Sequence, residues 1–338
     1  MTNNSSSSLI STAGGGDPGD HFRNLLFSSI YSVMGVVQVV GNSLIVLAIC
    51  KSKSLHRKEY CLPAMLACSD FLFGSGTLMA GCRRLQWTIT GQQNVLVTRW
   101  SCMLEPYTVT YILGGFTVPG MLTMISIDRC IACCSISAYM KLTGKRIFGA
   151  SLTVAAVGVC IGVSSYIQSF FHSTDQPAIT KMCFTNAAQT PVMGKVWTYY
   201  QWFGGMLSVF VYGVALVALY LGGKKDDRMS EVMKIHKKRQ LRVTKTLAYV
   251  IGCTFFLHSV PFCTVAWATG RVSPRTGNWL MPICGTFVAM NAANNIFIYL
   301  IKNKEIRHTI LGLFGFGSKQ TVVSEISPNN AKNPSEAN

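Results

Sequence analysis

The sequence predicts an all-α membrane protein, a bundle of seven transmembrane helices. Only 13% of its 338 residues are charged and 49% are hydrophobic, which is too little charge for a soluble protein of this size. Seven apolar segments each reach the roughly 20 residues that are needed to cross a hydrocarbon core about 30 Å thick. The net charge of +17 lies in short clusters between these segments, which favours basic loops beside lipid and argues against a nucleic-acid partner.

The spans follow one another across residues 25–301, and each is read from a continuous apolar run. We expect them at Leu25–Cys50, Tyr60–Ala80, Met103–Cys134, Ile147–Phe171, Val196–Leu221, Val243–Thr269 and Trp279–Ile301. Residues 1–24 and 316–338 are polar, and we expect both tails to be disordered. The first tail lacks the apolar stretch of a cleaved signal, so the first span is expected to act as the insertion signal.

The distribution of Lys and Arg predicts the orientation. Loops between spans one and two, three and four, and five and six are rich in these residues, and the opposite loops have far fewer. By the positive-inside rule the rich loops are cytoplasmic, which places the N-terminus outside the plasma membrane and the C-terminus inside. The outer tail then carries two overlapping glycosylation acceptors, at Asn3 and Asn4.

Most of the thirteen cysteines lie within the spans, where cysteine usually acts as a small buried hydrophobe. Cys102, which opens the third span, and Cys183, between spans four and five, lie on the oxidising side, and we favour a disulfide between them. Cys82 and Cys284 also lie near that face, so sequence alone leaves the connectivity open.

Asp70 is an ionisable residue halfway along the second span, where a carboxylate is costly unless it finds donors, water or a cation. Asn42 in span one and Asn291 and Asn295 in span seven lie at compatible depths. We interpret this group as a hydrated ion or switch site, with sodium as the candidate ion and no other cofactor. The alternative is a polar cluster that only holds the helices together.

Asp128 and Arg129 close the cytoplasmic end of span three. An arginine at this depth needs a partner, and the adjacent carboxylate of Asp128 can supply one. The alternative is a membrane-edge arginine whose long side chain reaches water.

Five short motifs lie at the expected depths of separate spans: Gly41-Asn42, Leu66-Ala67-x-x-Asp70, Asp128-Arg129-Cys130, Phe255 six residues before Pro261, and Asn295-Ile296-Phe297-Ile298-Tyr299. Together they resemble the motifs of the rhodopsin-like G-protein-coupled receptors. The resemblance covers residues 25 to 315 and implies a short amphipathic eighth helix within residues 302–315, opened by Lys304-Glu305-Ile306-Arg307.

The chain also departs from that pattern. Ile296 replaces the usual proline of span seven, and Ser259 stands where a tryptophan normally precedes Pro261. Cys102 lies two residues farther from the Asp-Arg pair than is usual in the family, which puts the geometry of the bridge in question. This divergent set is similar to the nematode serpentine chemoreceptors, particularly the srsx type.

The resemblance implies a two-state receptor. An extracellular small-molecule or peptide ligand would favour an outward swing of span six, with Pro261 as hinge and Phe255 as the packing element that moves. Arg129 and Tyr299 would then help to form the cavity for a heterotrimeric G protein.

Depth along the outer half of the bundle selects the ligand-contact candidates. They are Tyr107, Tyr111, Tyr200, Gln201, His258, Phe262, Trp267 and Met290. An aminergic receptor would need an acidic residue near Tyr111, and none is present there, so biogenic amines are disfavoured.

The main alternatives are a neuropeptide-type receptor and, from another class, a transporter or channel. The sequence shows neither the internal repeat typical of transporters nor the polar stripe of a channel pore. An enzyme is disfavoured because His258 is a lone intramembrane histidine and Asp70 has no acidic neighbour. A light receptor is disfavoured because the segment 279–301 contains no lysine.

Overall fold

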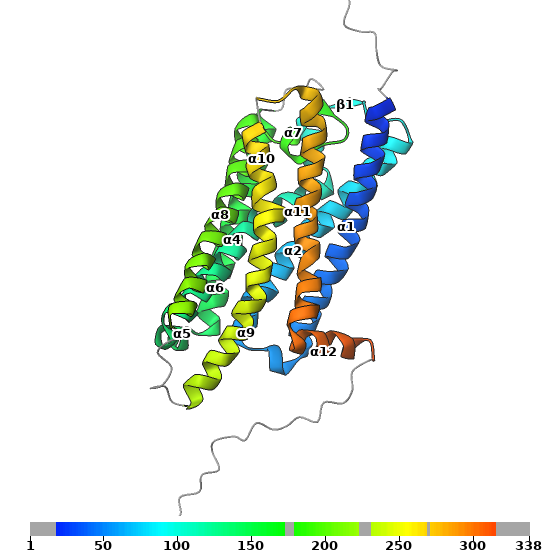
Figure 1. Ribbon diagram of the computed structural model, residues 1–338. Coiled ribbons are helices and arrows are strands. Elements are labelled where there is room, and N and C mark those ends of the chain that lie inside the picture. Colours follow the sequence, from blue (N-terminus) through cyan, green and yellow to red (C-terminus); the bar gives the residue numbers. More distant parts are fainter. Residues whose placement is uncertain (1–17, 173–178, 223–230, 269–270, 316–338) are drawn as a thin grey trace, which may run out of the picture.

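The computed structural model describes residues 18–172, 179–222, 231–268 and 271–315. Within this part, seven helical segments are long and apolar enough to cross a membrane, which confirms the predicted fold class (Figure 1). They are α1 (Pro18–Lys51), α2 (Lys58–Ile89), α4 (Pro106–Cys134), α6 (Gly144–Phe171), α8 (Pro191–Gly222), the combination of α9 (Glu231–Thr254) with α10 (Val260–Ala268), and α11 (Pro274–Lys302).

Most of these helices extend beyond the apolar runs that predicted them. The N-terminal tail was expected to reach residue 24, but α1 already begins at Pro18, so that prediction is wrong for residues 18–24. Asp20 lies in the first turn of α1, where a negative charge is favourable, and its carboxylate pairs with Arg23 at 2.7 Å. At its far end α2 continues to Ile89 instead of stopping at Ala80.

The third span begins later than predicted, at Pro106, and a separate short helix precedes it. This helix, α3 (Arg99–Met103), carries Cys102, and the residues Leu104 and Glu105 separate it from α4. The turn at Leu104 and Glu105 therefore accommodates the two extra residues between Cys102 and the Asp-Arg pair. The Cys102–Cys183 disulfide forms, with the two Cα atoms 5.3 Å apart, and confirms the predicted pairing.

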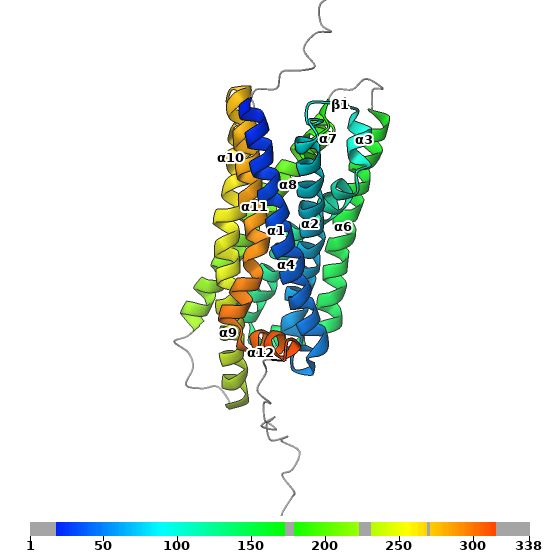
Figure 2. The ribbon, with the colours of Figure 1, turned by 90° about the vertical axis from the view of Figure 1, so that its right-hand side faces the viewer.

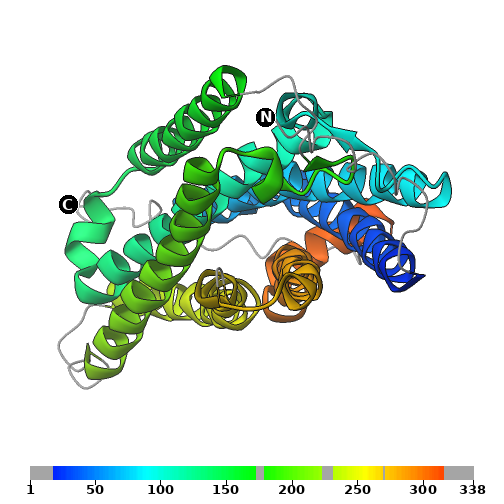
Figure 3. The same cartoon turned by 90° about the horizontal axis from the view of Figure 1, so that it is seen from above.

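The disulfide lies at one end of the bundle, which we call the disulfide end. Here β1 (Leu96–Val97) pairs antiparallel with β2 (Ile179–Thr180), and α7 (Thr185–Ala188) follows the second cysteine. Viewed from this end, α6 lies at the edge of the bundle, while α10 and α11 lie side by side (Figure 3).

Glycines allow close contact among α1, α2 and α4, which lie together in Figure 2. A Cβ on Gly35 would lie 2.5 Å from Cα of Leu78, and one on Gly114 would lie 2.5 Å from the backbone nitrogen of Phe73. In lipid such close backbone contact replaces much of the hydrophobic driving force for helix association.

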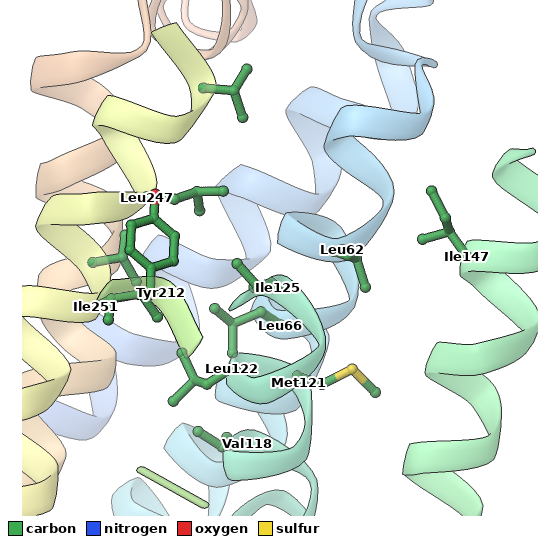
Figure 4. Packing of buried hydrophobic residues seen from close by; sticks show 12 residues of the cluster. Leu62, Leu66, Val118, Met121, Leu122, Ile125, Ile147, Tyr212, Leu247 and Ile251 are labelled. Carbon is green, nitrogen blue, oxygen red and sulfur yellow. The ribbon is translucent and has the colours of Figure 1, made fainter. Parts of the chain in front are cut away.

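Buried apolar side chains fill the bundle toward its opposite end. Leu62 and Leu66 of α2, Leu122 and Ile125 of α4, and Leu247 of α9 belong to one cluster, shown in Figure 4. Large apolar side chains also cover the outside; Phe210 and Phe256 are 71% and 68% exposed, as expected of surfaces that face lipid.

Helix α12 (Lys304–Leu313) lies across this opposite end, which we call the α12 end (Figure 1). Its buried residues Ile306 and Ile310 are one helical turn apart, so the helix has one inward face, as an amphipathic helix requires. The Asn303 side chain caps it by accepting a hydrogen bond from the amide of Ile306 at 3.1 Å. The predicted eighth helix is therefore present.

Candidate functional site

A cavity of about 470 Å³ opens within the bundle at the disulfide end. Its walls come from α1, α2, α4, α8, α10 and α11 and from the residues that follow Cys183. The lining is mainly aromatic and aliphatic: Tyr31, Tyr107, Tyr111, Phe184, Trp197, Phe262, Val265, Met281 and Val288 are among its members. A cavity of this size and character can hold one small organic molecule.

Three of the predicted contact residues line this cavity, namely Tyr107, Tyr111 and Phe262. Tyr111 lies against Phe73, with ring centroids 4.4 Å apart, and is stacked with Trp197 at 6.1 Å. Trp197 is buried and packs edge-on to Phe116. The aromatic residues therefore form a continuous wall at the inner part of the cavity.

Three further candidates, the buried His258 and Gln201 and the half-buried Tyr200, do not line the large cavity. His258 Nε2 lies 3.0 Å from Oε1 of Gln201, whose amide donates to the carbonyl of Gly115 at 2.6 Å. Both residues border a smaller cavity of about 10 Å³, which is also lined by Asp70 and Asn291. The Tyr200 hydroxyl donates to the carbonyl of Phe116 at 3.0 Å.

The two remaining candidates, Trp267 and Met290, line neither cavity. Trp267 is 60% exposed on the outer surface of α10, and Met290 is 37% exposed on α11. Both lie at a suitable depth, but they point away from the bundle. Depth was read from the sequence correctly, whereas the rotation of each helix about its axis was not.

Sequence reasoning missed Arg84, Tyr31 and Trp197 as lining residues. Arg84 looked like a loop residue because it follows the apolar run of span two, yet it is 6% exposed. The Gly114-Gly115 pair in span three was the available signal for Trp197, because the indole ring occupies the space that a Cβ of Gly115 would need.

The polar group around Asp70 is assembled as predicted in part. Asn295 donates to the Asp70 carboxylate at 2.6 Å, and Asn291 borders the same small cavity as Asp70. Asn42 instead donates to the carbonyl of Gln38 at 2.9 Å, within its own helix, and its side-chain oxygen is buried with no partner among the residues that the structure describes.

A π-helical turn precedes Pro261. It spans Phe255–Ser259, lies between α9 and α10, and contains the half-buried Phe255 and the buried His258. Proline removes a backbone donor and crowds the preceding turn, which accounts for the irregularity at this place.

Arg129 lies at the α12 end in a set of side chains that we call the Arg129 network: Glu59, Asp128, Arg129, Tyr139 and Gln240. The guanidinium pairs with Asp128, donates to Gln240 Oε1 at 2.8 Å and donates to the Tyr139 hydroxyl at 3.1 Å. The Gln240 amide in turn donates to Glu59 at 3.1 Å. Arg129 is fully buried, so α2, α4 and α9 are linked through it.

Tyr139 belongs to α5 (Ile136–Lys141), outside the spans. Burial raises the pKa of Tyr139 to about 12, so its hydroxyl keeps its proton at physiological pH. Lys58 holds α5 in place by donating to the carbonyls of Tyr139 and Leu142, at 2.7 and 3.1 Å. Tyr299, the other predicted residue at this end, is buried at 3% exposure. Asn3 and Asn4 lie outside the described residues.

Comparison with known proteins adds a family and a fold. The family "Serpentine type 7TM GPCR chemoreceptor Srsx" matches residues 35–314. Trace amine-associated receptor 9 of Mus musculus is 24% identical over 301 residues, 80% of each chain, and olfactory receptor 4K13 of Homo sapiens is 28% identical over 46% of this chain and 45% of that one. Squid rhodopsin has a similar structure, with a TM-score of 0.66 at 14% identity over 92% of this chain and 91% of that chain.

Proposed function

Because this chain belongs to the serpentine chemoreceptor family Srsx and is thus a G-protein-coupled receptor of the plasma membrane, we propose that its extracellular ligand binds in the large cavity and its G protein at the α12 end. The observation that carries this proposal is the pairing of an aromatic cavity at one end with a buried Arg129 at the other, where Asp128, Gln240 and Tyr139 hold its guanidinium. The family favours a chemosensory role over a neuropeptide receptor, a transporter or a channel.

The proposed orientation puts the disulfide end outside the cell. Disulfides persist in oxidising surroundings, which supports this side for Cys102 and Cys183. The basic residues Lys51, Lys53 and Lys141 support the cytosolic side for the α12 end, since they lie at the junctions between consecutive spans there.

The signalling step follows from the two ends taken together. The cavity adjoins the π-helical turn, because Pro261 and Phe262 of α10 line the cavity and lie just beyond Ser259, where the turn ends. A ligand that binds better when α10 is displaced favours a new position of α9, and Gln240 of α9 then leaves Arg129. Arg129 and Tyr299 thereby become available to a G protein α subunit.

We also propose that the small cavity beside Asp70 takes one sodium ion. Its carboxylate and the amide oxygen of Asn291 are ligands of the kind that hard cations prefer, and the space of about 10 Å³ is close to that of one water-sized species. Sodium chloride, compared with choline chloride, is expected to raise the melting temperature of the intact protein and to leave that of Asp70→Asn unchanged. An equal effect on both proteins would contradict the assignment.

Nucleotide exchange on a panel of G proteins tests the receptor proposal. Membranes containing the intact protein are compared with membranes containing Arg129→Ala at equal surface expression, with and without mixtures of small odorants and peptides. We expect exchange that requires Arg129. A well-expressed protein that supports no exchange with any G protein or mixture would refute the proposal.

A further inference from the structure

The large cavity has a charged wall as well as an aromatic one. Arg84 of α2 lines it and is 6% exposed. Its Nε and Nη2 atoms donate to the carbonyls of Met182 and Cys183 at 2.8 and 3.0 Å, which fixes the guanidinium beside the disulfide. The remaining N–H groups of a guanidinium, which has five donors, stay available for an acceptor.

Arg84 has no carboxylate within ion-pair distance in the part of the chain that the structure describes. The other cavity arginine, Arg23, differs in this respect because it pairs with Asp20 at 2.7 Å. None of the described residues that line the cavity is Asp or Glu. A buried arginine normally has a counterion, so the missing one points to an anionic ligand.

A second observation points to an acceptor at the same place. The hydroxyl of Tyr107, a cavity residue that is 2% exposed, is buried and has no hydrogen-bond partner among the described residues. The Arg84 guanidinium carbon lies 5.6 Å from the centroid of the Tyr107 ring, so the guanidinium and the ring border one region. A buried hydroxyl without a partner is costly unless a ligand supplies the acceptor.

We propose that this cavity binds a small aromatic carboxylate, whose anionic group accepts from Arg84 and the Tyr107 hydroxyl while its ring lies against Tyr111, Trp197 and Phe262. The inference rests on the proposal that the cavity is the ligand site. It also separates this chain from receptors of protonated amines, because an ammonium group would meet the charge of Arg84 with no carboxylate to balance it.

The test measures binding without signalling. Full-length protein in nanodiscs is melted with 3-phenylpropionate, with the neutral 3-phenylpropanamide and with phenethylamine. We expect the acid to raise the melting temperature, the amide to need an at least ten-fold higher concentration for the same rise, and the amine to have no effect. Equal or stronger stabilisation by the amine or the amide, or none by the acid at millimolar concentration, would overturn the proposal.

Two matched variants locate the acid. Tyr107→Phe removes a hydroxyl that has no protein partner, so the free protein should melt as before while its affinity for 3-phenylpropionate falls about ten-fold. Tyr166→Phe is the control, because the Tyr166 hydroxyl is also buried with no partner in the described part of the chain, and Tyr166 does not line the cavity. Equal effects of the two variants on affinity would refute the placement. Since melting involves no G protein, a protein that binds the acid but supports no exchange would keep this inference and refute the receptor proposal.

Discussion

Trp197 reaches the cavity wall because the residue opposite it, Gly115, has no side chain. A Cβ built on Gly115 would overlap the far edge of the indole ring. The carbonyl of this glycine also accepts a hydrogen bond from the amide of Gln201 at 2.6 Å, so α4 and α8 are in close contact at this level. The position of one ring in the ligand site thus depends on the absence of one methyl group.

Gly115→Ala is expected to displace Trp197 and to lower the free energy of unfolding by about 1–3 kcal/mol, as overpacking in a core does. Melting in detergent measures the change. Gly213→Ala is the control, because a Cβ at Gly213 of α8 would meet nothing within 4 Å and alanine favours a helix. A Gly115→Ala protein as stable as Gly213→Ala would contradict this account.

Individual residues also show where prediction from the sequence succeeded and where it failed. Tyr107, Tyr111 and Phe262 were found because depth along a span can be counted in residues. Trp267 and Met290 passed the same test and face outward, since aromatic and sulfur-containing side chains suit lipid as well as a cavity. Arg84 was missed because an arginine near a span end normally lies in water or beside lipid headgroups.

Among the helices, the sixth span has an internal break that the others lack in the described part of the chain. The π-helical turn Phe255–Ser259 gives the α9–α10 segment one place at which its backbone hydrogen bonds are already irregular. Bending there costs less than bending a regular helix. Pro261 predicted from the sequence that this span has a hinge. It did not predict that the irregular turn is π-helical.

Pro261→Ala is expected to restore a backbone donor and to make the α9–α10 segment straighter and stiffer. Ligand-stimulated nucleotide exchange should fall several-fold while the melting temperature stays the same or rises. Pro63→Ala in α2, which is also an interior proline but lies away from the π-helical turn, is the control. Comparable losses of exchange in the two variants would argue against a hinge at Pro261.

The ends of the helices were the least predictable feature. A window of apolar residues locates what lies in hydrocarbon, but α2 continues through Arg83 and Arg84 to Ile89, and α1 begins at Pro18. Helical hydrogen bonding does not stop at the lipid boundary, so polar residues extend a helix as readily as apolar ones do. The sequence predicted the number and order of spans but underestimated their lengths.

Gln240→Ala should raise basal exchange several-fold, because it removes the hydrogen bond that α9 accepts from Arg129, worth about 1.5–3 kcal/mol for a charged donor. Basal exchange in membranes at equal receptor density measures the effect. Glu59→Gln is the matched control, since an amide oxygen at residue 59 still accepts from Gln240. Basal exchange that is unchanged in Gln240→Ala would show that α9 is held elsewhere.

At the scale of the whole molecule, the disulfide joins segments 81 residues apart and fixes one wall of the cavity. Phe184, Thr185 and Ala187, which follow Cys183, all line the cavity. Cys183 itself has a φ of 45°, a left-handed conformation that is unusual for a residue other than glycine. Arg84 donates a hydrogen bond to the carbonyl of Cys183, at the residue that has this conformation.

Replacing Cys102 and Cys183 together by serine is expected to lower the free energy of unfolding by about 2–5 kcal/mol and to weaken ligand binding in the cavity. Melting with and without dithiothreitol measures the first effect. Cys82→Ser, at an exposed free cysteine, should melt like the intact protein. If dithiothreitol lowers the melting temperature of the double variant as much as that of the intact protein, its effect does not come from reducing the Cys102–Cys183 disulfide, and this account is contradicted.

The group that α9 offers to Arg129 is an uncharged amide. An ion pair at this place would weaken as salt rises and would break when its carboxylate takes up a proton, whereas an amide neither titrates nor attracts counterions. Glu59 holds the other side of that amide from a second helix, so the orientation of Gln240 is fixed without a charged side chain at this position of α9. The Arg129–Gln240 hydrogen bond should therefore respond less to acidification of the cell's interior, or to a change in its ionic strength, than an ion pair at the same place would.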